Sequence, residues 1–121
     1  MIKIISVLLL LITTNVYSQT WVLVSSTDDS RLSVDKSSIK KELKNVSVKW
    51  KIEFIKLNST VFNKSLLNCS ERESTLLEMT VIEPSGNSRI MDTKNLGLEY
   101  VPKSDKPASL AFDYVCSRTV K

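Results

Sequence analysis

Apolar and polar residues alternate without interruption from position 46 to position 54. The even-numbered positions are valine, valine, tryptophan, isoleucine and phenylalanine, and the odd-numbered positions between them are serine, lysine, lysine and glutamate. Successive side chains of a strand point to opposite faces, so this stretch predicts a strand with one buried face and one solvent-facing side. One-sided burial is typical of an antiparallel sheet. We therefore expect the rest of the domain to be built around this strand.

Further strands are predicted before and after this one. Short apolar stretches rich in β-branched residues and bounded by polar turns carry the signal. The expected strands span residues 21–26, 31–35, 46–58, 61–69 and both arms of a hairpin over 75–91. The expected connections are a turn at 27–30, a charged link at 40–45, a loop at 59–60 and a loop at 92–106 that covers one end of the sheet.

The hairpin over 75–91 rests on its turn. Residues 74–82 suit a helix or a strand in isolation, and their threonine and valine content favours a strand. The turn Pro84-Ser85-Gly86-Asn87 follows, in which proline presets φ and glycine admits positive φ. The two arms are therefore expected to pair across this turn.

One amphipathic helix is predicted near the C-terminus, over residues 108–118. Its apolar residues recur at spacings of three and four, which places them on one face. These residues are Ala108, Ala111, Phe112, Val115 and Cys116. Pro107 suits the first turn of a helix, where its missing N–H is not needed. The expected fold is an α+β domain in which an antiparallel sheet of about five to six strands packs against this helix.

Residues 1–18 have the three-part plan of a secretory signal peptide. Lys3 supplies a basic start, residues 4–12 form an apolar run, and Val16 and Ser18 suit the −3 and −1 positions of a signal peptidase site. A membrane anchor is the alternative, but the apolar run is shorter than the roughly 20 residues that a span needs. We expect a single mature domain at 19–121 that is exported to the periplasm, the outer-membrane surface or the medium.

The chain has two cysteines, Cys69 and Cys116. An even number of cysteines in an exported chain predicts a disulfide, and the helix face that carries Cys116 can reach the end of the strand that carries Cys69. A metal pair and a reactive thiol are the alternatives. The sequence has no histidine and no second cysteine close to either one, which disfavours zinc.

The composition argues against several chemistries. Without histidine, neither a Ser-His-Asp nor a Cys-His catalytic arrangement can be built. A Ser-Lys pair is the remaining catalytic alternative, but no motif singles one out. Two glycines are too few for a phosphate-binding loop. Glu71 and Glu73 flank Arg72 in what is expected to be a solvated turn. The formal charge of +4 is mild and forms no run that indicates nucleic acid. We expect no catalytic residues, no cofactor, no metal and no nucleic-acid partner.

Structural roles are expected for Trp21, Asp35 and Trp50. The Asp35 carboxylate can cap a short helical turn over residues 36–40. The aromatic residues are expected in the core because each lies on a predicted apolar face, and Trp50 is expected to anchor the contact between sheet and helix. The residues in this group are Trp21, Trp50, Phe54, Phe62 and Tyr114. The sequence identifies no ligand-binding residue.

The order of these features resembles the surface-adhesin protein E family of Gram-negative bacteria, over nearly the whole mature chain. The matching residues are Trp21 after the signal, Val34-Asp35 followed by Ser38-Ile39, Val48-Lys49-Trp50, Asn68-Cys69 with Arg72, the Ser85-Gly86 turn, and Tyr114-Val115-Cys116. The resemblance implies a twisted antiparallel sheet closed by a C-terminal helix and held by one disulfide.

The resemblance also implies a function. The family's namesake binds host extracellular-matrix and serum proteins at the bacterial surface, so an adhesin-like, non-catalytic binding protein is expected here. Either the solvent-facing side of the sheet or the 92–106 segment would bind the partner. The alternative is a periplasmic inhibitor or envelope accessory protein of the same architecture. The oligomeric state and the ligand do not follow from the sequence.

Overall fold

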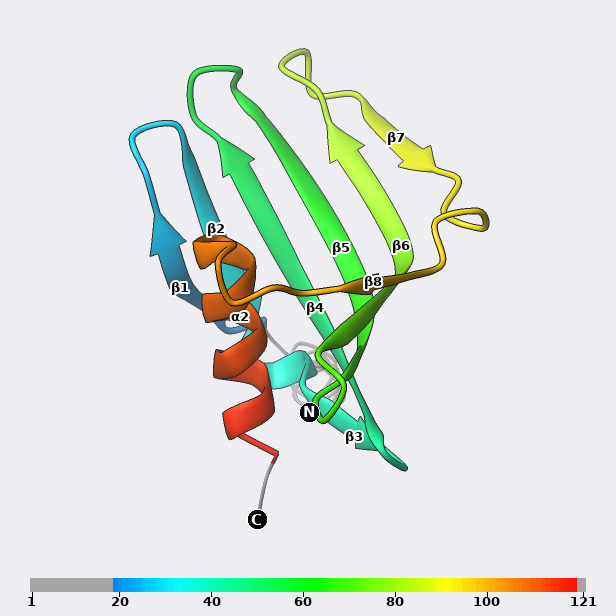
Figure 1. The fold of residues 1–121 in the computed structure, drawn as a ribbon. Helices are drawn as coiled ribbons and strands as arrows, with labels where there is room; N and C mark the ends of the chain where they lie inside the picture. Colours follow the sequence, from blue (N-terminus) through cyan, green and yellow to red (C-terminus); the bar gives the residue numbers. More distant parts are fainter. Residues whose placement is uncertain (1–18, 120–121) are drawn as a thin grey trace, which may run out of the picture.

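The computed structural model describes residues 19–119, in which an antiparallel sheet curves around one α-helix (Figure 1). The expected signal peptide at 1–18 lies outside the described residues. The strands are β1 (Trp21–Ser26), β2 (Ser30–Asp35), β3 (Lys40–Glu42), β4 (Asn45–Phe54), β5 (Ser59–Asn68), β6 (Glu73–Ile82), β7 (Ser88–Met91) and β8 (Leu98–Tyr100). The helices are the short 3-10 helix η1 (Lys36–Ser38) and α2 (Lys106–Ser117). The expected α+β class is confirmed.

The sheet has eight strands in the described part of the chain, more than the five to six expected. Six follow one another in the order β1-β2-β4-β5-β6-β7, while β3 pairs with β4 and β8 pairs with β6. β3 lies in the expected charged link, and β8 lies in the expected 92–106 loop. Each is three residues long and fully exposed. Backbone pairing with a neighbouring strand, rather than a hydrophobic pattern, therefore defines both.

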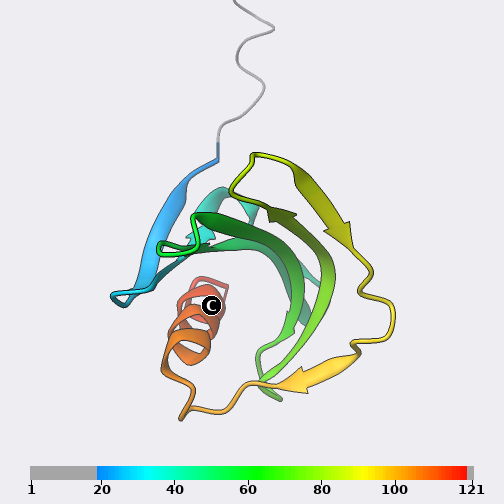
Figure 2. The ribbon, with the colours of Figure 1, turned by 90° about the horizontal axis from the view of Figure 1, so that it is seen from above.

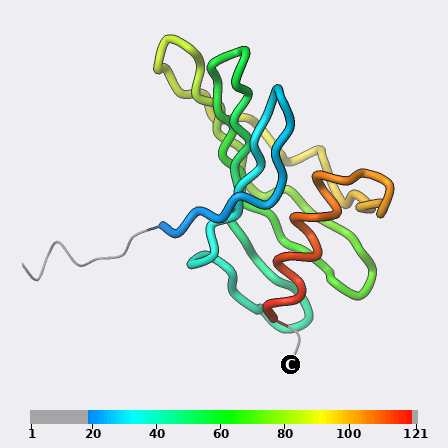
Figure 3. The backbone as a smooth tube through the Cα atoms, turned by 90° about the vertical axis from the view of Figure 1, so that its left-hand side faces the viewer, coloured from blue at the N-terminus to red at the C-terminus, as the bar shows by residue number. Residues whose placement is uncertain are grey.

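The β1–β2, β4–β5 and β6–β7 hairpins turn at the same end of the sheet (Figure 1, Figure 3). The turn between β4 and β5 begins earlier than the sequence predicts, because β4 ends at Phe54 and β5 already begins at Ser59. Asn58 in the turn has a φ of 50°, a conformation that asparagine adopts more readily than most residues. The Ile55 N–H donates to the Asp29 carbonyl over 2.8 Å, which continues the pairing of β2 with β4 by one residue pair beyond Ser30 and Phe54.

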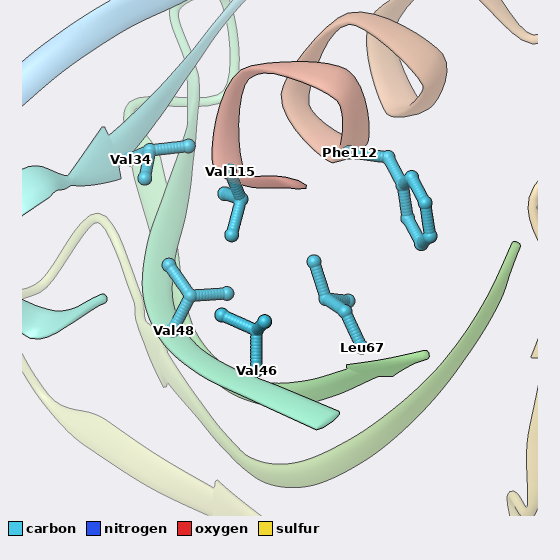
Figure 4. Close-up of a cluster of buried hydrophobic side chains, with 6 residues drawn as sticks. All are labelled: Val34, Val46, Val48, Leu67, Phe112 and Val115. Carbon is cyan, nitrogen blue, oxygen red and sulfur yellow. The ribbon is translucent and has the colours of Figure 1, made fainter. Parts of the chain in front are cut away.

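α2 lies on the concave side of the sheet (Figure 2), and the hydrophobic core lies between the two (Figure 4). Its buried cluster consists of Val34, Val46, Val48, Leu67, Phe112 and Val115. The side chains from the sheet and from α2 point toward one another. Val46 and Val48, at even-numbered positions of β4, therefore face the helix, as the alternation predicts, whereas Phe54 lies outside this cluster. Ser47 on the opposite face is only 6% exposed, so that face is less open than the alternation alone predicts.

A serine hydroxyl closes a gap along one edge of β4. β2 pairs with residues 50–54 and β3 with residues 45–47, which leaves the Lys49 N–H facing neither strand. The Ser38 hydroxyl accepts from this N–H over 2.8 Å and donates to the Asp35 carbonyl over 2.7 Å. η1 therefore continues the hydrogen bonding between the two shorter strands.

Asp35 occupies the cap position that the sequence predicts. Its Oδ1 accepts from the backbone N–H groups of Ser37 and Thr20, over 3.1 and 3.0 Å, and from the Ser37 hydroxyl over 2.6 Å. The helical turn that it caps has three residues instead of the expected five. Because Asp35 is buried, these donors satisfy a carboxylate that has little contact with water.

Two tethers hold α2 on the sheet. The expected disulfide between Cys69 and Cys116 is present, with the two Cα atoms 5.8 Å apart. The Arg72 guanidinium is the second tether, since it donates to the Val101 carbonyl over 3.0 Å and to the Ser109 hydroxyl over 3.1 Å. The Arg72 side chain is 16% exposed. The expected turn is present with Ser70 and Glu71 exposed, but the Arg72 side chain within it is largely buried against α2.

Candidate functional site

An apolar cleft of about 260 Å³ opens between α2 and the concave face of the sheet. From the sheet it is lined by Leu32, Val34, Val48, Trp50, Ile52 and Leu67. From the opposite side it is lined by Asp105, Pro107, Ala108, Ala111, Phe112 and Val115. We call this feature the apolar cleft. It adjoins the buried cluster and shares five of the cluster's residues.

Small residues on α2 leave the apolar cleft unfilled. Ala108 and Ala111 face the sheet at positions where a larger side chain would occupy the space. On the other side, the Trp50 indole N–H donates to the Ser65 hydroxyl over 2.9 Å, which satisfies its polar atom within the sheet. Protein interiors rarely leave such space, and an enclosed void of this size would cost on the order of 6 kcal/mol. Access to solvent or a ligand offsets part of this cost.

Asp105 is the charged residue among those that line the apolar cleft. It is the N-cap residue of α2, but its side chain makes no capping hydrogen bond. Within residues 19–119 it also forms no ion pair. Its exposed carboxylate is therefore available to a group that lies at this end of the cleft.

The second candidate feature is the segment from residue 88 to residue 100, which we call the edge ribbon. β7 and β8 both pair with the same edge of β6, and between them the Thr93 hydroxyl donates to the Leu77 carbonyl over 2.9 Å. Almost every residue of the ribbon is exposed. Among the described strands, β7 pairs with β6 alone, so its outer edge leaves backbone groups available to another chain.

Three large apolar side chains of the edge ribbon point to the same side of the sheet. Ile90, Leu98 and Tyr100 are 84%, 65% and 63% exposed. Across the strands, Ile90 of β7 pairs with Thr80 of β6, which in turn pairs with Phe62 of β5. In the same way, Leu98 of β8 pairs with Thr75 of β6, which pairs with Leu66 of β5. Because directly paired residues share a face, and alternate residues of β8 do too, all three point to the convex side. Exposed apolar groups on a shared face are a feature of many interaction surfaces.

A basic and aromatic cluster lies on the same convex side. The Lys51 ammonium is 4.5 Å from the ring centre of Trp21 and 6.0 Å from that of Phe62, within the range of cation–π attraction. Phe62 is 37% exposed, and neither ring belongs to the buried core cluster. The expectation that both lie in the core therefore fails, because β1 and β5 turn these positions outward. Lys49 also faces Lys64 across the strands.

The remaining expected residues are placed as follows. Trp50 packs beside the core cluster and contributes to the apolar cleft, and Tyr114 also contacts the core. Cys69 and Cys116 are joined, which leaves no free thiol.

In the described part of the chain, no three His, Cys, Asp or Glu side chains are grouped to hold a metal ion. No described helix is long and apolar enough to span a membrane.

The sequence pointed to residues 92–106, which overlap the edge ribbon only at 92–100, and gave no indication of the apolar cleft. The signal for the second half of the ribbon was available, because Leu98 and Tyr100 are apolar residues outside any amphipathic period. The signal for the cleft was weaker, since two alanines on the apolar face of a helix are equally compatible with close packing.

Comparison with known proteins adds no assignment, because no family model, curated protein or solved structure matches the chain. The resemblance to the surface-adhesin protein E family therefore stays a hypothesis drawn from the sequence.

Proposed function

We propose that this protein is an exported, non-catalytic binding protein that holds a protein partner on the convex side of the edge ribbon. One observation carries the proposal, namely the exposure of Ile90, Leu98 and Tyr100 on a shared face. Burying side chains of this size against a partner is worth about 1.5–3 kcal/mol each. Aromatic anchors such as Tyr100 are enriched among the residues that dominate binding energy.

Export is supported by two independent features. The first is the signal-peptide pattern of residues 1–18. The second is the Cys69–Cys116 disulfide, because disulfides persist in oxidising compartments and are rare in the cytosol. The absence of histidine from the sequence supports a non-catalytic role.

We further propose that the partner is a host extracellular or surface protein, as the resemblance to the surface-adhesin protein E family suggests. Protease treatment of intact native cells tests the location that this role needs. We expect the chain to be degraded while a periplasmic control protein stays intact. Survival of the chain would contradict the adhesin-like role, and would favour an inhibitor or accessory protein acting inside the envelope.

Site-specific photocrosslinking tests the docking face itself. A photoreactive residue is placed at Leu98 in one variant and at the neighbouring Glu99 in a matched control, since adjacent strand residues point to opposite faces. Each variant is purified and irradiated with candidate matrix and serum proteins, one at a time. We expect a crosslinked species of protein plus partner from position 98 and none from position 99.

Two outcomes would contradict the docking proposal. One is equal crosslinking from both positions, which would mean that the contact does not depend on the face. The other is a crosslink from position 98 that joins two copies of this chain, which would make the edge ribbon a self-association surface.

A further inference from the structure

We propose that the apolar cleft is a binding site for a small amphiphile, with the aliphatic chain in the cleft and a head group that is cationic or donates hydrogen bonds at Asp105. This site is separate from the edge ribbon, because the cleft lies on the concave side of the sheet and the apolar groups of the ribbon lie on the convex side. The inference therefore does not depend on the proposed protein partner.

The chemistry of the lining favours an aliphatic chain. Apart from Asp105, every residue that lines the cleft is apolar, and the indole N–H of Trp50 is already bonded to Ser65. A ligand group with several polar atoms would lose its bonds to water here and find few replacements. A hydrocarbon chain loses none, and it gains contact with aliphatic and aromatic surfaces.

The shape of the lining favours an extended chain. On β4, Val48, Trp50 and Ile52 are alternate residues that cover about 13 Å along the strand. On α2, Ala108 and Val115 are about 10 Å apart along the helix axis. The cleft between these two rows is therefore longer than a single ring system needs.

The charge at the mouth selects the head group. The Asp105 carboxylate has no capping bond and no ion pair within residues 19–119. An ammonium, hydroxyl or amide head can bond to it, whereas a carboxylate head is repelled. The site should therefore prefer an amine over a fatty acid that has the same chain.

Tryptophan fluorescence tests this proposal directly. The sequence has two tryptophans, and Trp50 lines the cleft while Trp21 lies on the convex side. A Trp21→Phe variant leaves Trp50 as the single reporter. It is titrated with decylamine, decanol and decanoate at concentrations below those at which they form micelles. We expect a saturable change in Trp50 emission, with decylamine binding at least tenfold more tightly than decanoate.

Variants of the cleft provide the controls. Ala111→Leu adds three carbons to the helix wall of the cleft and should abolish the decylamine response, while Leu110→Phe adds bulk to the exposed side of the same helix and should leave it unchanged. Asp105→Asn should reduce the preference for decylamine over decanoate at least threefold. Equilibrium dialysis of the unaltered protein with decylamine gives a second measurement that needs neither a reporter nor a variant.

Several results would overturn the inference. They are the absence of saturable binding by both fluorescence and dialysis, binding that persists in a folded Ala111→Leu variant, and tighter binding of decanoate than of decylamine. If Ala111→Leu does not fold, Ala108→Leu takes its place, because it fills the same cleft from one turn earlier. Changes on the edge ribbon should not alter amphiphile binding, so failure of this site is distinguishable from failure of the proposed function.

Discussion

Arg72 donates a hydrogen bond to the Asp113 carboxylate over 2.9 Å, across 41 positions of sequence. The same guanidinium is 4.9 Å from the ring centre of Phe112, so it covers the helix residue that lies in the middle of the core. Arg72 lies in the turn after β5 with a φ of 55°, and its side chain contacts α2. This contact makes the turn between β5 and β6 a clamp on α2.

Removing this clamp should destabilise the domain. We expect Arg72→Ala to lower the free energy of unfolding by about 3 kcal/mol, because it leaves the Ser109 hydroxyl and the Val101 carbonyl without their partner. Arg72→Lys should recover less than half of the loss, since an ammonium cannot reproduce the planar fork. Urea denaturation measures each value. Arg89→Ala, which breaks the exposed pair with Glu83, is the control and should change stability by less than about 0.5 kcal/mol.

The disulfide should contribute a comparable amount. Closing a loop of 47 positions restricts the unfolded chain by about 4 kcal/mol on the chain-entropy model. We therefore expect the paired substitution Cys69→Ser with Cys116→Ser to lower the free energy of unfolding by 2–5 kcal/mol, as loss of a native disulfide from a small domain typically does. An unchanged denaturation midpoint in the presence of a reducing agent, with thiol titration proving reduction, would contradict a stabilising role.

The Ser38 hydroxyl should protect a single backbone amide. Ser38→Ala removes the acceptor of the Lys49 N–H, and we expect a loss of about 1–2 kcal/mol together with faster hydrogen exchange at Lys49. Amide exchange followed by NMR measures this residue by residue. Ser88→Ala in the exposed strand β7 is a matched substitution and should leave the Lys49 amide unaffected. Unchanged exchange at Lys49 in Ser38→Ala would show that another group protects it.

Filling the apolar cleft should stabilise the protein. Ala111→Leu adds three carbons to a space of about 260 Å³, and we expect a gain of about 1 kcal/mol in the free energy of unfolding. Thermal unfolding of the ligand-free protein measures the change. A loss of more than about 1 kcal/mol would mean that the cleft is too narrow for the added carbons, as overpacking is destabilising.

The sequence by itself determined the features whose signal is local. The alternation at 46–54 placed Val46 and Val48 toward the core, the spacing of Phe112 and Val115 located the helix, and the turn at Gly86 located a hairpin. Each follows from a periodicity of side chains or from a residue's own backbone preference. The cysteine pairing also followed, because two cysteines allow a single intramolecular bond.

Only the tertiary structure decided the features that depend on partners distant in sequence. β3 and β8 are strands because β4 and β6 offer free backbone groups, which a three-residue pattern does not reveal. The bulge between Leu23 and Ser25 shifts the register of β1 against β2, so that Trp21 pairs with Asp35 and its ring lies beside Lys51 on the convex side. The apolar cleft arises because the path of α2 across a concave sheet leaves space above Trp50 that two alanines do not fill. The size of this space depends on the distance between the helix and the sheet, and a local sequence pattern does not reveal that distance.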